Sequence, residues 1–153
     1  RVKLMVRQRG VTLIELMIGI ALLAILAVAI FPLGRAWVAN AQITKTEKEL
    51  LEAYARAKNE ALRNPNAVKE GAKAASLEVT STTVVVKDSN NATIWSFNIT
   101  PTVTIQLSTL PASATCDSAT QKVELNNNAS LQTNTCTQYL IQASGGQDEA
   151  GYF

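Results

Sequence analysis

The sequence contains no histidine, so it lacks the commonest general base and the commonest zinc ligand of proteins. It also has no Gly-rich phosphate loop, no paired-cysteine zinc spacing and no nucleophile elbow. The turn Asp88-Ser89-Asn90-Asn91 and the acids Asp148 and Glu149 offer oxygen ligands for calcium, but we interpret both stretches as polar loops. We therefore predict that the chain is not an enzyme and binds no metal or other cofactor.

Arginine is missing from the second part of the chain. After Arg63 the sequence has four lysines and seven acids, which give this part a net charge of −3. Phosphate binding depends on lysine and arginine side chains, and the C-terminal stretch 145–153 carries Asp148 and Glu149 instead. We therefore expect no direct DNA binding.

No ionisable side chain occurs from Leu16 to Gly34. As a helix this stretch measures about 28 Å, close to the thickness of the hydrocarbon core of a bilayer. Lys3, Arg7 and Arg9 precede it without an acid among them. The positive-inside rule therefore predicts a single membrane span with its amino terminus in the cytoplasm.

Three interpretations of this apolar stretch compete. The first is a signal peptide that is cut at Ala27-Val28-Ala29, and the second is a membrane anchor that is not cut. The third is a segment that stays on the mature chain after cleavage upstream of it. Glu15 argues against the signal peptide, because a carboxylate in an apolar helix costs about 2.5 to 3.5 kcal/mol and is usually kept for a function. An ordinary interfacial position of Glu15 at the headgroups is the alternative.

The stretch Arg9-Gly-Val-Thr-Leu-Ile-Glu-Leu-Met17 resembles the cleavage and assembly motif of type IV pilins and type II secretion pseudopilins. The resemblance implies that a prepilin peptidase cuts after Gly10 and methylates the new amino terminus at Val11. It also implies that Pro32 is the proline that bends the helix of these proteins. The family most often has phenylalanine where this chain has Val11.

Cleavage after Gly10 would place a cationic amine four residues before Glu15. Both charges would lie in or beside an apolar phase, where an unpaired charge is costly and a paired one is tolerated. The resemblance implies that the partner of Glu15 is the amine of a neighbouring subunit. The apolar side chains around it, which we expect to form contacts between subunits, are Leu13, Ile14, Leu16 and Met17.

The stretch 35–64 has the pattern of an amphipathic helix, and Asn64-Pro65-Asn66 is expected to end it. We therefore predict one helix from Val11 to Asn64. The stretch 49–64 looks like the helix of H-type pseudopilins and their minor-pilin relatives. The expected apolar face comprises Ala36, Ile43, Leu50, Tyr54, Ala57 and Ala61, and the opposite face carries Lys48, Glu52, Arg56 and Glu60 as solvated i,i+4 pairs.

Past Pro65 the sequence is rich in Ser, Thr, Asn and Val, with short alternating runs that suit strands. The separating turns predict an antiparallel sheet, so the fold class is α+β with a long helix packed on a small, pilin-like sheet domain. The separators are Asp88-Ser89-Asn90-Asn91, Pro111 and Asn126-Asn127-Asn128. The candidate strands lie at 84–86, 95–99, 103–107, 123–125 and 139–141.

Cys116 and Cys136 are the only cysteines. An even pair in the exported part of a chain predicts a disulfide, worth about 3 kcal/mol for a loop of this length. A free thiol is the alternative. The family often has a bridge in its C-terminal region, whereas its H-type members frequently lack one.

Four segments follow: a leader peptide (1–10), a transmembrane and assembly half of the helix (11–34), an amphipathic half (35–64) and an outer β-rich domain (65–153). The resemblance implies a structural subunit of a type IV pilus or type II secretion pseudopilus, with a minor priming or tip subunit favoured. A major pilin, and an anchored exported binding domain that never polymerises, are the alternatives.

The resemblance also implies the partners and the location. The partners would be other pilin or pseudopilin subunits, prepilin peptidase, the inner-membrane assembly platform and inner-membrane lipid. We expect the chain to span the inner membrane once and then to enter a periplasmic or cell-surface filament.

Overall fold

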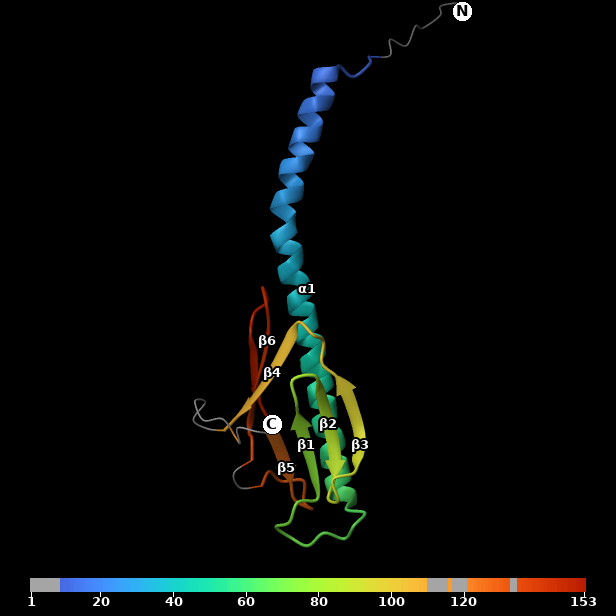
Figure 1. Cartoon of the computed structure of the whole chain (residues 1–153), viewed down its shortest axis with the longest axis vertical. Helices are drawn as coiled ribbons and strands as arrows, with labels where there is room; N and C mark the ends of the chain where they lie inside the picture. The colour runs from blue at the N-terminus through green and yellow to red at the C-terminus, as the bar shows by residue number, and fades with distance from the viewer. Residues whose placement is uncertain (1–8, 110–115, 117–120, 133–134) are drawn as a thin grey trace, which may run out of the picture. The chain divides into compact units, whose positions relative to one another are not determined.

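The computed structural model describes residues 9–109, 116, 121–132 and 135–153. These residues form one α-helix and seven β-strands (Figure 1). The chain divides into two compact units, the first ending at Arg35 and the second running from Ala36 to Phe153. Residues 1–8 of the predicted leader and the predicted separator Pro111 lie outside the described residues.

Helix α1 (Leu13–Arg63) is the single helix of the described residues. It begins two residues later than predicted, because Thr12 is the N-cap and not a helical residue. It continues through Pro32, so this proline does not end the helix. The described chain therefore has one uninterrupted helix where the sequence predicted one.

The helix ends at the predicted place. Asn64 follows its last residue with a φ of 42°, the left-handed conformation that often closes a helix and that Asn tolerates. The Asn64 side chain then accepts a hydrogen bond from the Val68 backbone N–H at 2.7 Å and donates one to the Val68 carbonyl at 3.0 Å. The turn after the helix is thus held by one side chain.

All strand pairs are antiparallel, as predicted. One sheet has the order β3-β2-β1-β5 and the other has the order β4-β6-β7. The five predicted strands are confirmed, and β1 and β7 are additional. The strands are β1 (Ala75–Val79), β2 (Thr83–Asp88), β3 (Thr93–Asn98), β4 (Val103–Ser108), β5 (Gln121–Leu125), β6 (Gln138–Ala143) and β7 (Glu149–Tyr152).

Strand β1, which the sequence analysis missed, is a central strand of its sheet. It pairs with β2 on one side and with β5 on the other, so that Leu77 lies opposite both Val86 and Val123. Directly opposite residues share a face of the sheet, and all three of these side chains are fully buried. This row of aliphatic side chains faces the helix.

The C-terminal residues form strand β7 and cover an aromatic cluster. Gly151 lies against Tyr139, and a Cβ at this position would overlap the tyrosine ring. Phe153 follows, with its ring centroid 5.0 Å from that of Tyr54 and 5.4 Å from that of Tyr139. The end of the chain therefore connects β6 to the helix.

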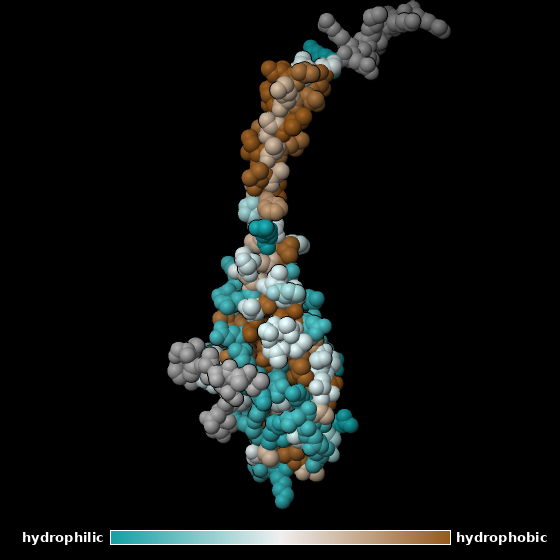
Figure 2. All heavy atoms as spheres, in the orientation of Figure 1, coloured by the Kyte–Doolittle hydropathy of each residue, from teal (hydrophilic) through white to brown (hydrophobic). Residues whose placement is uncertain are grey.

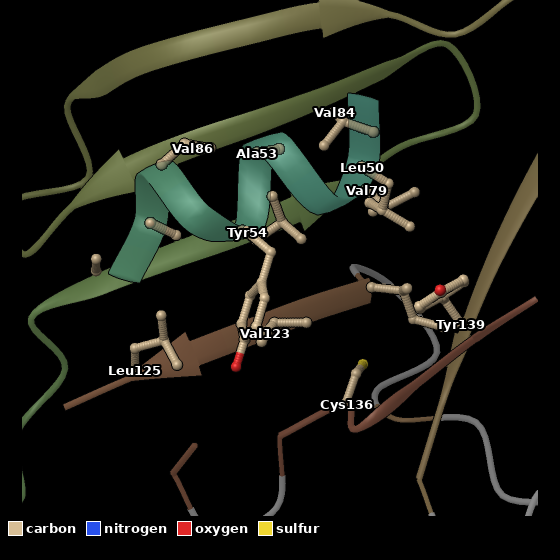
Figure 3. Packing of buried hydrophobic residues seen from close by; sticks show 14 of the residues in the cluster. Leu50, Ala53, Tyr54, Val79, Val84, Val86, Val123, Leu125, Cys136 and Tyr139 are labelled. Carbon is tan, nitrogen blue, oxygen red and sulfur yellow. The ribbon is translucent and has the colours of Figure 1, made fainter. Parts of the chain in front are cut away.

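The core of the second unit forms where one face of α1 meets the strands. Figure 3 shows Leu50, Ala53 and Tyr54 of the helix close to side chains of β1, β2 and β5. Alanines at four-residue spacing allow close approach, because their side chains are small. The buried helix residues are Ala39, Ile43, Thr46, Leu50, Ala53, Tyr54, Ala57 and Ala61, whereas the predicted Ala36 is only half-buried.

The ion pairs of the helix differ in part from the predicted solvated face, because the side chain of Glu60 is only 12% exposed. Glu52 and Arg56 pair as expected, at 3.0 Å. Glu60 pairs with Arg63 at 3.7 Å and not with Arg56. Arg56 also lies 4.9 Å from the centroid of the Trp95 ring, which adds a cation–π contact between helix and β3.

Cys116 and Cys136 form the predicted disulfide, with their Cα atoms 5.4 Å apart. Both cysteines are buried and belong to the core. The bridge joins positions 20 residues apart in the sequence. It therefore ties Cys116, which precedes β5 in the chain, to Cys136, two residues before β6.

On the other face of the first sheet, Glu78 lies between two lysines. Its carboxylate is 2.8 Å from the Lys87 ammonium and 3.4 Å from that of Lys122, and only 14% of its side chain is exposed. Burial alone would raise the pKa of Glu78, but hydrogen bonds and charge attraction from both lysines outweigh it and hold the pKa below its usual value.

This ion-pair cluster predicts a pH-dependent effect of Glu78→Gln. A carboxylate with a lowered pKa stabilises the fold above its usual pKa and loses that contribution as the pH falls through the lowered value. We expect Glu78→Gln to reduce the free energy of unfolding by about 1 kcal/mol near pH 7 and to have no effect near pH 2.

Urea unfolding of the detergent-solubilised chain at both pH values measures the difference. Glu70→Gln, at an exposed acid, is the matched control and is expected to have no effect at either pH. An equal loss of stability from Glu78→Gln at both pH values would contradict the role of the ion pairs.

Candidate processing and assembly site

The first turn of α1 contains a capping box formed by Thr12 and Glu15. The Glu15 backbone N–H donates to Thr12 Oγ1 at 3.3 Å, and the Thr12 backbone N–H donates to Glu15 Oε2 at 3.2 Å. The Thr12 hydroxyl also donates to Glu15 Oε2, at 3.3 Å. The two residues therefore satisfy backbone groups that the start of a helix leaves unpaired.

This capping box determines where the Glu15 carboxylate points. It is folded back onto the N–H of Thr12, one residue from Val11, where cleavage after Gly10 would create an amine. A negative charge in the first turn also interacts favourably with the positive end of the helix dipole. Glu15 is thus already partly compensated within its own chain.

Gly10 and Val11, the predicted processing residues, lie outside the helix. Both are exposed, and neither belongs to a helix or strand. A protease acts on an extended, accessible segment more readily than on a helix, since the helical backbone is hydrogen-bonded to itself. The bond between the two residues is therefore open to cleavage in this structure.

The predicted contact residues Leu13, Ile14, Leu16 and Met17 belong to a helix segment that is apolar on all sides. Each of them is exposed by 58% or more. An 18-residue window of α1 is apolar enough to cross a membrane, and none of that window is buried. Figure 2 shows this segment covered by hydrophobic residues, in contrast to the mixed surface of the second unit.

At the end of the apolar stretch, Arg35 folds back over Phe31. The guanidinium carbon lies 4.9 Å from the centroid of the phenylalanine ring. A long cationic side chain at the edge of an apolar segment covers apolar surface with its stem while its charge stays near water. Arg35 thus marks one limit of the apolar segment, and Glu15 lies near the other.

The stretches with possible calcium ligands were predicted to be polar loops, but Glu149 is the first residue of strand β7. Asp88 Oδ1 accepts hydrogen bonds from the backbone N–H groups of Asn90 and Ala92, both at 2.9 Å. Asp148 accepts a hydrogen bond from Gln142 at 3.0 Å. No group of three or more potential ligand side chains that could hold a metal is found in the described part of the chain.

Thr12 is the residue of this site that the sequence analysis missed. The signal was present, because Thr-x-x-Glu directly before an apolar run is the pattern of a capping box. The charge of Glu15 alone does not reveal this role, which depends on its hydrogen bonds to Thr12. The structure adds a local function for Glu15 to the predicted one between subunits.

The capping box predicts that Thr12→Ala frays the first turn of α1. Loss of an N-cap threonine costs about 1 kcal/mol, so the amides of Glu15 and Leu16 should exchange with solvent about fivefold faster. Thr12→Ser keeps the hydroxyl and is the matched control. NMR hydrogen exchange in detergent micelles measures the effect, and equal exchange rates in all three proteins would show that Thr12 is not the cap.

One comparison with known proteins points to the same segment. Residues 5–31 match the family described as the prokaryotic N-terminal methylation motif. No curated protein and no solved structure matches the chain. The matched residues include the candidate processing bond, the capping box and most of the apolar helix segment. The chain therefore carries an N-terminal methylation motif on a long helix that packs against antiparallel sheets, which is a pilin-like α+β arrangement.

Proposed function

We propose that this protein is a structural subunit of a type IV pilus or a type II secretion pseudopilus. Prepilin peptidase cuts it after Gly10 and methylates Val11. The observation that carries the proposal is the methylation motif at residues 5–31. The motif includes most of an apolar helix segment that has no buried side chain. Such a segment needs either lipid or other apolar helices around it.

In this proposal the same helix segment lies first in the membrane and then in the filament. Before assembly it spans the inner membrane, with the leader in the cytoplasm and the β-rich unit outside. During assembly, the inner-membrane platform transfers it into a filament, where helices of neighbouring subunits replace the lipid. The exchange is favourable only if the one charge of the segment, Glu15, finds a partner.

Glu15 is proposed to pair with the amine of Val11 on a neighbouring subunit. Its direction supports this role, because the capping box already turns the carboxylate towards the amino-terminal end of the helix. After cleavage, that end carries a positive charge in every subunit. Each subunit would therefore bring one carboxylate and one amine, so that a stack of subunits is neutral along its length.

Within this class we favour a minor subunit that primes or caps the filament, because the stretch 49–64 resembles H-type pseudopilins and minor pilins. The disulfide between Cys116 and Cys136 favours a major pilin as the second candidate, since H-type members frequently lack such a bridge. The abundance of the protein in sheared filaments distinguishes the two, because a major subunit is the bulk of the fibre.

The processing step predicts the amino terminus of the mature protein. We expect protein recovered from membranes to begin at Val11, with or without one methyl group, and Gly10→Val to abolish this cleavage. Intact-mass measurement and N-terminal sequencing determine the first residue of the wild type and of Gly10→Val. A start at Ile30, or an uncut leader in both proteins, would contradict the filament proposal and favour an exported or anchored domain that does not polymerise.

The assembly step predicts the effect of Glu15→Gln. Glutamine can serve as the acceptor in a capping box, so the helix start is preserved while the charge is lost. We expect processing and membrane insertion to remain, and incorporation into filaments to fall at least about tenfold.

The ratio of subunit in sheared filaments to subunit in membranes measures this effect. Glu52→Gln, an acid on the exposed face of the same helix, is the matched control and should assemble normally. Normal incorporation of Glu15→Gln would contradict the pairing with a neighbouring amine.

A further inference from the structure

Trp37 is an exposed aromatic side chain at the start of the second unit. It is 74% exposed, and the adjacent Val38 is 48% exposed. The other tryptophan, Trp95, is half-buried, with Arg56 4.9 Å from its ring and the ring of Phe97 5.6 Å away. No contact among the described residues of the second unit explains why a large apolar side chain is needed at position 37.

The position of Trp37 along the helix suggests what covers it. Arg35 is the first ionisable residue after the uncharged stretch that begins at Leu16. Trp37 comes two residues later, and Ala39 is the first buried residue of α1. Apolar surface therefore continues past the first charge and ends where the helix begins to pack on the sheets.

The dimensions place Trp37 at the boundary of a bilayer. The uncharged stretch from Leu16 to Gly34 measures about 28 Å as a helix, and Trp37 lies about 4 Å further along the chain. Hydrocarbon cores are about 30 Å thick. If the stretch fills the core, then the indole comes at the level of the lipid carbonyls and headgroups.

Tryptophan suits this level because its ring is apolar and its N–H is a hydrogen-bond donor. Tryptophan and tyrosine are enriched at both interfaces of membrane proteins for this reason. The fold-back of Arg35 over Phe31 agrees with the same boundary, because the charge is carried by a stem that lies along apolar surface.

We propose that Trp37 binds the headgroup and carbonyl region of the membrane leaflet opposite the leader, and that it sets the depth at which the helix is inserted. The proposal rests on the membrane anchoring proposed above. A protein partner for Trp37 is the competing possibility, and the continuity of its apolar surface with the membrane-spanning stretch favours lipid.

Tryptophan fluorescence in lipid vesicles tests the proposal with the full chain. Phosphatidylcholine vesicles are prepared with lipids brominated close to the headgroup or close to the end of the acyl chain, since bromine quenches tryptophan only nearby. The signal of Trp37 is the difference between the wild type and Trp37→Phe. The exposed position of Trp37 makes this substitution compatible with folding, and Trp95→Phe gives an independent single-tryptophan measurement.

We expect the Trp37 signal to be quenched at least about twofold more by the shallow bromine than by the deep one, as for an interfacial indole. Trp95, which remains in Trp37→Phe, should be quenched by neither. Equal emission of Trp37 in vesicles and in water, or stronger quenching by the deep bromine, would overturn the proposal.

Vesicle flotation in the same samples separates this proposal from the membrane anchoring on which it rests. Flotation of the chain with unquenched Trp37 would overturn only the interfacial role of Trp37. Failure of the wild type and both variants to float would overturn the anchoring as well.

Discussion

The folded unit depends on the packing of one stripe of helix α1 against two small sheets. The stripe alternates large side chains such as Leu50 with alanines such as Ala53 and Ala57, and all three are fully buried. Neither sheet could bury its apolar face alone, because an isolated sheet of three or four short strands has water on both sides. The helix therefore supplies the common surface on which both sheets fold.

Over its first half the same helix has no such partner among the residues that the structure describes. Its side chains there are apolar in every direction, and lipid or other helices must surround them. One charge, Glu15, lies at the edge of this segment, and the capping box with Thr12 reduces the cost of its burial. Under the proposed function, this local arrangement would let the precursor tolerate one carboxylate and would leave it available for an ion pair after cleavage.

Much of the fold could be predicted from local patterns. The end of the helix at Arg63 followed from Asn64 and Pro65, since each of these residues disfavours helix in its own way. Five strands followed from alternation and turn residues. Strand β7 could not be predicted, because three of its four residues, Glu, Ala and Gly, are depleted in strands. It is a strand because β6 lies beside it and because glycine at 151 leaves room for the ring of Tyr139.

The sequence by itself determined the apolar segment, its length, the position of Glu15 within it and the presence of a single pair of cysteines. These features depend only on residue type and spacing along the chain. Tertiary structure alone decided which distant residues come into contact. Examples are Glu78 between Lys87 and Lys122, and Phe153 against Tyr54. Such contacts join residues far apart in the sequence, so they arise only when strand register and helix packing bring them together.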